Sequence, residues 1–333
     1  MHMKIMREND VKIFEELVKM EQDQLLKTLF TFLKKNYDNV TATEDYLFAE
    51  GDIPIALVAH LDTVFPDPPE NVYYDPRKGV IWSPEGLGAD DRAGIFSILK
   101  IVKAGYKPHI IFTTGEERGG IGAAQLIIKN PKCPFKELKY MIELDRAGTC
   151  DCVFYDCEND LFTEYIESFG FIEALGSFSD ISILAPHWGV AAVNLSIGYE
   201  NEHSYREVLH VGPLYRTIKR VIAMLKDADN ITEPFIYIRS YISRFGYCWE
   251  DYLTGDIALY SKEIVKCTSC GKNFHEYETI PVKTPSGGTV FYCPDCIADN
   301  DIDWCEICGE AFEVDEYTKE AHICRDCRKM GGH

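Results

Sequence analysis

Short apolar runs alternate with segments of helical periodicity up to about residue 230, and this alternation constrains the fold more than any other feature of the chain. A strand of a parallel sheet is buried on both faces, so it is apolar along its whole length. The expected strands are Ile53–His60, His109–Thr114, Tyr140–Asp145, Cys152–Tyr155 and Val190–Ile197.

The segments between these runs repeat their apolar residues about every 3.6 positions, which is typical of helices that cover a sheet. Residues 11–35 predict one or two helices, with Asn9 or Asp10 as candidate N-caps. The other expected helices are Arg92–Ala104, Gly119–Lys129, Leu161–Phe169 and Leu214–Leu225. Strands and helices in this order predict an α/β fold, a three-layer sandwich with a mainly parallel central sheet.

The composition changes after residue 230. Residues 231–262 are rich in Phe, Tyr and Trp, and we interpret them as a connecting segment packed on the first domain. Residues 263–333 are rich in cysteine. The expected organisation is therefore a large domain over residues 1–230, the aromatic-rich connection over 231–262, and a small domain over 263–333.

The small domain carries four C-x-x-C pairs, each able to give two thiolates to a tetrahedral zinc ion. The pairs are Cys267/Cys270, Cys293/Cys296, Cys305/Cys308 and Cys324/Cys327. So small a domain, with few apolar residues, needs metal to fold. We predict two structural zinc ions in a tandem zinc-ribbon-like domain paired sequentially, with interleaved pairing as the alternative. Its expected role is stability, oligomerisation, or binding of a protein partner.

Charge and hydropathy exclude several classes of partner. The formal net charge of −20 would repel nucleic-acid phosphates, and the chain contains no run of Lys and Arg. No apolar stretch approaches the roughly 18 residues needed to span a membrane. The first residues lack the basic-then-apolar layout of a secretory signal. We therefore expect a cytoplasmic protein, in which paired cysteines bind metal and do not form disulfides.

Polar residues that can bind metal follow the expected strands or precede a helix. In open α/β sheets the carboxyl ends of the strands form the edge where ligands bind, so these side chains are expected to lie close together. They are His60, Asp62, Asp90, Glu116, Glu117, Asp145 and His203.

This mixture of side chains suits a pair of divalent metal ions, because a carboxylate can bridge two ions and imidazole favours transition metals. Without metal, so many carboxylates would repel one another. In an extended segment His60 and Asp62 share one face, so Asp62 can accept a hydrogen bond from the non-ligating nitrogen of His60. The adjacent side chains of Glu116 and Glu117 diverge, so one can bind metal while the other moves a proton.

Five segments in order resemble the di-zinc exopeptidase superfamily, which includes tripeptide aminopeptidases, aminoacylases, glutamate-releasing carboxypeptidases and leucyl aminopeptidases. The resemblance covers roughly residues 50–225. The segments are H-L-D-T-V, G-A-D-D-R-A-G, T-T-G-E-E-R-G-G-I-G-A, E-L-D-R-A-G and E-H-S.

The resemblance implies a role for each candidate ligand. Asp90 would bridge two metal ions, with His60 and Asp145 completing one site and Glu117 and His203 the other. Zinc is the expected catalytic metal, although cobalt and manganese suit the same ligands.

The resemblance also implies that Glu116 is the general base for the attacking water and that Asp62 orients His60. Two further residues stand out in the sequence itself. Ser179 and Asp180 are candidates for the lining of a substrate pocket, with helix capping as the alternative.

The chain departs from the lidded branch of the superfamily. Only 57 residues separate Asp145 from His203, and 29 separate His60 from Asp90, so neither gap holds an inserted domain. A bare catalytic domain favours an aminopeptidase-like hydrolase of small peptides. An N-acyl amino acid deacylase or a carboxypeptidase on the same site remains an alternative. An alternative of another class is a non-catalytic adaptor that binds a protein partner through the zinc ribbons.

Overall fold

The computed structural model describes residues 6–239, 264–275, 279–297, 300–305, 311–315, 318 and 322–330. The chain divides into two compact units, Met1–Ser240 and Tyr241–His333. Most of the aromatic-rich segment expected at 231–262 lies outside the described residues.

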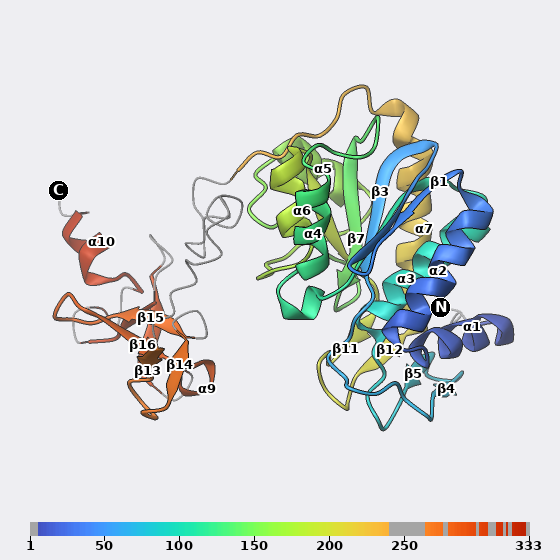
Figure 1. The fold of residues 1–333 in the computed structure, drawn as a ribbon. Coiled ribbons are helices and arrows are strands. Elements are labelled where there is room, and N and C mark those ends of the chain that lie inside the picture. Colours follow the sequence, from blue (N-terminus) through green and yellow to red (C-terminus); the bar gives the residue numbers. More distant parts are fainter. Residues whose placement is uncertain are drawn as a thin grey trace. The chain divides into compact units, whose positions relative to one another are not determined.

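The first unit is built on an eight-stranded sheet in which most neighbouring strands are parallel, as predicted (Figure 1). Its strands, in spatial order, are β1 (Asn39–Ala42), β2 (Tyr46–Glu50), β6 (Pro108–Thr113), β3 (Ile53–His60), β7 (Tyr140–Arg146), β10 (Ala192–Ser196), β8 (Asp151–Val153) and β9 (Ile172–Glu173). The parallel pairs β6–β3–β7–β10 form the centre, so the carboxyl ends of these strands meet at one edge.

Helices cover both faces of this sheet, which makes the α/β sandwich that the sequence predicts (Figure 1). The helices are α1 (Glu8–Val18), α2 (Gln22–Asn36), α3 (Ala89–Lys103), α4 (Ile121–Lys129), α5 (Asp160–Ser168), α6 (Ile181–Trp188) and α7 (Val211–Asp227). Two short 3₁₀ helices, η1 (Glu116–Arg118) and η2 (Ala228–Asn230), follow β6 and α7.

Helix α3 lies unusually close to the sheet, and a glycine permits this approach. A Cβ atom at Gly94 would lie 2.3 Å from the backbone oxygen of Leu144 in β7. Only glycine avoids that clash, so the amino-terminal turn of α3, which carries Asp90, rests directly on the central strand.

Helix α1 begins one residue before the expected caps. Its N-cap is Arg7, so the prediction of Asn9 or Asp10 as N-cap was wrong. The carboxylate of Asp10 is instead buried and accepts hydrogen bonds from Lys100 (2.8 Å) and Tyr215 (2.6 Å). The side chain of Asp10 therefore forms a tertiary ion pair with Lys100 and does not cap the helix as the local sequence pattern predicted.

A second, four-stranded sheet in this unit was not expected from the sequence. Its strands, in spatial order, are β11 (Tyr199–Glu200), β12 (Val208–His210), β5 (Val80–Trp82) and β4 (Tyr73–Asp75). Each has only two or three residues, too few to show an alternating pattern. The loop between β11 and β12 carries His203.

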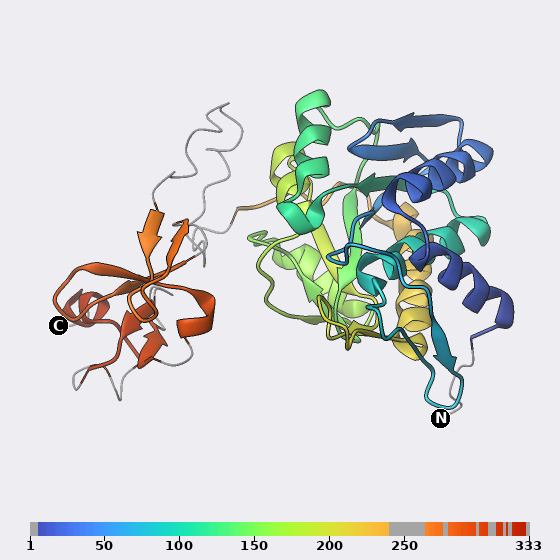
Figure 2. The same cartoon turned by 60° about the horizontal axis from the view of Figure 1, so that its bottom comes forward.

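The described residues of the second unit form short strands and two short helices, α9 (Pro294–Ile297) and α10 (Arg325–Met330) (Figure 2). Strands β13 (Ile264–Lys266) and β14 (Asn273–His275) form a hairpin. A second sheet has the order β16 (Thr289–Tyr292), β15 (Ile280–Lys283), β18 (Ala311–Glu313) and β17 (Ile302–Trp304).

Candidate metal centre

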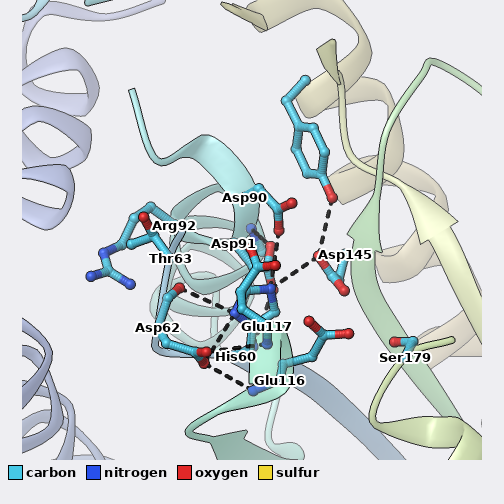
Figure 3. A network of polar contacts seen from close by, with 12 residues as sticks. His60, Asp62, Thr63, Asp90, Asp91, Arg92, Glu116, Glu117, Asp145 and Ser179 are labelled. Carbon is cyan, nitrogen blue, oxygen red and sulfur yellow. Dashed lines mark hydrogen bonds and ion pairs between the residues drawn. The ribbon is translucent and has the colours of Figure 1, made fainter. Parts of the chain in front are cut away.

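The predicted metal-binding residues meet at the carboxyl edge of the central strands, and all of them except His203 are labelled in Figure 3. His60 is the last residue of β3, and Asp145 lies near the end of the neighbouring strand β7. Glu116 and Glu117 form η1, directly after β6 on the other side of β3. The strand order therefore brings together residues from three separate parts of the sequence.

Asp90, in the first turn of α3, lies between two imidazoles. Its Oδ1 is 3.0 Å from Nε2 of His60, and its Oδ2 is 3.1 Å from Nε2 of His203. The two oxygens of one carboxylate thus face two different imidazole nitrogens, which is the arrangement a bridging carboxylate needs.

The remaining candidates divide between these two imidazoles. Oδ1 of Asp145 lies 3.3 Å from Nε2 of His60, and Oε2 of Glu117 lies 3.1 Å from Nε2 of His203. The candidate ligand atoms therefore form two sets that share Asp90. The assignment of these residues as metal ligands stays a prediction.

Glu116 lies on the Asp145 side of the centre. Its candidate ligand oxygen lies within 4.8 Å of those of His60 and Asp145, while Glu117 groups in the same way with His60 and Asp90. The two adjacent glutamates thus point to different parts of the cluster, as expected for neighbouring side chains that diverge.

Asp62 holds the site together through more contacts than the sequence suggested. Nδ1 of His60 lies 3.2 Å from the backbone oxygen of Asp62 and 3.5 Å from its Oδ1. The carboxylate oxygens accept the backbone N–H groups of Glu116 and Glu117, each at 3.2 Å. Asp62 therefore orients the imidazole mainly through its carbonyl and fixes the η1 turn through its carboxylate.

Crowded carboxylates perturb one another strongly in the absence of metal. Burial and the nearby charge of Asp145 raise the pKa of Glu116 to about 10, and burial and Asp90 raise those of Glu117 and Asp145 to about 7. The hydrogen bond with Asp90 raises the pKa of His203 to about 9. Protons and divalent cations can both relieve this repulsion, and oxygen and imidazole donors in two adjoining sets fit a pair of such cations.

The residues next to Asp90 are themselves anchored. Asp91 accepts the backbone N–H groups of Gly94 (2.8 Å) and His60 (3.3 Å). The buried guanidinium of Arg92 donates to the backbone oxygens of Leu17 (3.2 Å) and Leu61. The start of α3 is thus tied to β3 and to the end of α1.

Three supporting residues were missed by the sequence analysis. Asn194 accepts the backbone N–H of Asp145 and donates to its backbone oxygen, both at 3.0 Å. Tyr199 donates its hydroxyl to Oδ1 of Asp145 (3.0 Å), and Glu207 accepts the backbone N–H of Asp90 (3.0 Å). No local motif marks these residues, because each contact joins positions at least 49 residues apart.

Ser179 and Asp180 are fully buried. The hydroxyl of Ser179 donates to Glu143, and that of Thr113 donates to Asp180. Both candidate pocket residues are therefore enclosed within the protein, and their place in the lining of a substrate pocket stays a prediction.

The thiols of the second unit gather in two groups. Cys267, Cys270, Cys293 and Cys296 place their sulfur atoms within 4.8 Å of one another, and so do three thiols of the other two pairs. The latter are Cys305, Cys324 and Cys327, while Cys308 lies outside the described residues. The grouping follows the sequential order of the pairs and suggests a small zinc-binding domain.

The same type of hydrogen bond occurs within each of the two thiol groups. The backbone N–H of Cys293 points to Sγ of Cys267 at 3.4 Å, and that of Cys324 points to Sγ of Cys305 at 3.3 Å. In each group, therefore, the first cysteine of the second pair donates to the first cysteine of the first pair.

Comparison with known proteins bears on the class of the first unit. Residues 42–163 match the sequence model of Peptidase family M28. No curated protein matches the chain. The family match confirms the resemblance to di-zinc exopeptidases and supports a metal-dependent peptide hydrolase.

Solved structures share the fold at low sequence identity. Aminopeptidase PepT from Bacillus cereus aligns with a TM-score of 0.54 and 17% identity, over 68% of this chain and 99% of its own. A tripeptidase from Staphylococcus aureus has a TM-score of 0.53 and 15% identity, over 68% and 100% of the two chains. A TET aminopeptidase from a Thaumarchaeota archaeon has a TM-score of 0.52 and 11% identity, over 66% and 97%.

The described residues contain no helix with the length and hydropathy required to cross a membrane.

Proposed function

We propose that this protein is a two-metal aminopeptidase that removes residues from the amino terminus of small peptides. The observation that carries the proposal is the position of Asp90, with one carboxylate oxygen 3.0 Å from His60 and the other 3.1 Å from His203. The match to Peptidase family M28 over residues 42–163 supports peptides as the substrate class.

Five residues would hold the two catalytic ions. Asp90 would bridge them, His60 and Asp145 would complete one site, and Glu117 and His203 the other. Zinc, cobalt or manganese bound there would polarise the scissile carbonyl and lower the pKa of the attacking water.

Glu116 is the proposed general base. Its backbone is held by Asp62, and its side chain lies beside His60 and Asp145 at the open edge of the sheet. In this role it takes a proton from the attacking water and returns it to the nitrogen of the leaving amine. Because it is itself outside the proposed ligand set, its carboxylate is free to exchange that proton.

The charge around the site favours a free amino terminus over an acylated one. Asp180 adds negative charge beside Glu116 at neutral pH, because burial raises its pKa only to about 6, and it does not belong to the proposed ligand set. An α-ammonium group is attracted by this field, whereas an N-acyl amino acid brings only a carboxylate, which is repelled.

A substrate panel tests the proposal against its alternatives. Di- and tripeptides with free amino termini are compared with the same peptides acetylated at that end and with N-acyl amino acids. We expect cleavage of the free-amine series only, with release of the first residue. Exclusive hydrolysis of N-acyl amino acids would instead identify a deacylase, release from the carboxyl end would identify a carboxypeptidase, and an inactive protein retaining only thiol-bound zinc would identify an adaptor.

A further inference from the structure

Glu207 is a buried carboxylate that contacts the bridging aspartate from behind. The residue is 1% exposed, and its Oε1 accepts the backbone N–H of Asp90 at 3.0 Å. The backbone amides of Ala89 and Gly88 also face this carboxylate. Glu207 therefore holds the whole turn that enters α3.

Burying the carboxylate of Glu207 at this position costs free energy of folding. Among the residues that the structure describes, no group donates a hydrogen bond to the other oxygen of Glu207, Oε2, although that atom is buried. Burying a carboxylate with one oxygen unpaired costs free energy that the fold alone does not require. A role for the contact with Asp90 gives a reason for this arrangement.

The same loop carries His203. The backbone N–H of Glu207 donates to the oxygen of Ser204 (3.0 Å), and the hydroxyl of Ser204 donates to the oxygen of Asn201 (2.7 Å). These bonds close a compact turn whose two ends both reach Asp90. His203 faces its Oδ2, while Glu207 holds its backbone.

We infer that Glu207 is a positioning residue that sets the separation between Asp90 and His203 and so closes the metal site formed by Glu117 and His203. The inference rests on the proposed two-metal function. The other site depends less on this contact, because His60 and Asp145 lie on paired strands and Asn194 holds the backbone of Asp145. Loss of Glu207 should therefore weaken one site selectively.

Manganese titration of the full chain measures this directly, because Mn²⁺ prefers carboxylate and imidazole ligands to thiolates. Free Mn²⁺ is followed by its electron paramagnetic resonance signal. We expect two ions bound by the unmodified protein and, in Glu207→Ala, one ion held normally with the second at least about tenfold weaker. Glu207→Gln keeps an acceptor for the Asp90 N–H and should restore most of the second affinity.

Two control variants separate positioning from general damage. Glu200→Gln removes an exposed carboxylate at the start of the same loop and should leave both ions bound. Ser204→Ala removes the hydroxyl and its hydrogen bond to Asn201, keeps the backbone bond from Glu207 and does not touch Asp90, so its effect measures loop order alone. If Glu207→Ala does not fold, Glu207→Asp, which retracts the carboxylate by one methylene, replaces it.

Kinetics give a second measure. Restoring saturating Mn²⁺ should recover kcat in Glu207→Ala, since the ligands themselves are intact. If Glu207→Ala bound each of the two Mn²⁺ ions as tightly as the unmodified protein does, the inference would be overturned. Failure of the unmodified protein to bind two ions would instead overturn the proposed function, so the two failures are distinguishable.

Discussion

The two units of this chain differ in where their candidate metal-binding side chains lie relative to the hydrophobic core. In the first unit the cluster around Asp90 lies at the edge of a sheet whose apolar core is complete without it. In the second unit the cysteines are themselves core residues, since Cys305 and Cys324 form one cluster with Phe312. Among the described residues of this unit, another buried apolar cluster is centred on Val282, Tyr292 and Ala311.

This difference indicates what metal does in each unit. A site at the edge of a finished core could lose its ions and leave the fold intact, which agrees with the catalytic role that we propose for metal there. A core made partly of thiols depends on the ion for cohesion. Hydrogen bonds from the backbone of Cys293 and Cys270 outweigh the effect of burial and lower the pKa of Cys267 to about 6, which favours the thiolate that zinc requires.

Loss of a thiol from the second unit should have the largest effect. In Cys267→Ser one structural zinc is lost, and because such ions contribute roughly 10 kcal/mol or more of apparent folding free energy, the second unit should unfold. Zinc content per chain and calorimetry check this, with peptide hydrolysis by the first unit expected to persist. Cys133→Ser, a thiol of the first unit outside any candidate metal group, is the matched control. If the second unit stayed folded without its zinc, metal would not be required for folding in either unit, and the proposed difference between the units would be wrong.

Glu116→Gln comes next and tests whether the first unit separates chemistry from stability. Removal of a general base typically lowers kcat by about 10²–10⁴-fold, while the core around the site is unchanged. We expect that loss with an unaltered midpoint of thermal unfolding. Glu137→Gln, an exposed glutamate after α4, serves as the control. Full activity in Glu116→Gln would assign the proton transfer to another residue.

Asn194→Ala sharpens the comparison, because this residue belongs both to the sheet and to the support of the site. Its side chain pairs with the backbone N–H and oxygen of Asp145. Leaving these buried groups unpaired should lower the free energy of unfolding by about 1–3 kcal/mol. Urea denaturation and Mn²⁺ titration measure the two consequences together. Asn194→Asp retains the acceptor and should lose less stability and less Mn²⁺ affinity than Asn194→Ala. If Asn194→Ala kept its full stability but lost metal binding, the two roles of Asn194 would be separate.

The smallest effect concerns pH and the first unit alone. His109 is buried against Phe135, accepts the backbone N–H of Gly51 at 3.1 Å, and has its pKa lowered from 6.5 mainly by burial. As the pH falls below 6.5 the unfolded chain takes up a proton that the folded one refuses, so this stability is present above pH 6.5 and declines below it. The decline should be at most about 1.4 kcal/mol per pH unit.

His109→Gln should remove this dependence while keeping a donor and an acceptor. The measurement is the difference in unfolding free energy between the two proteins from pH 7 to pH 5, which cancels the other titrating groups. A difference that does not change with pH would show that His109 is protonated equally in both states.

Much of the first unit could be read from the sequence because its central strands are buried on both faces. β3 has the bounds expected, Ile53–His60, since an unbroken apolar run followed by polar residues leaves little ambiguity. Helix α6 was not expected. It has eight residues, and Pro186 near its end breaks the helical pattern.

The sequence by itself determined the kinds of residue at the candidate metal centre and their order along the chain, because strand ends and motifs are local features. Only the tertiary structure decided how they are held. Asn194, Tyr199 and Glu207 support the site from distant segments, and the carboxylate of Asp62 binds the η1 turn more closely than the imidazole it was expected to orient. Such contacts depend on strand order and on side chains meeting across the fold, which no local pattern encodes.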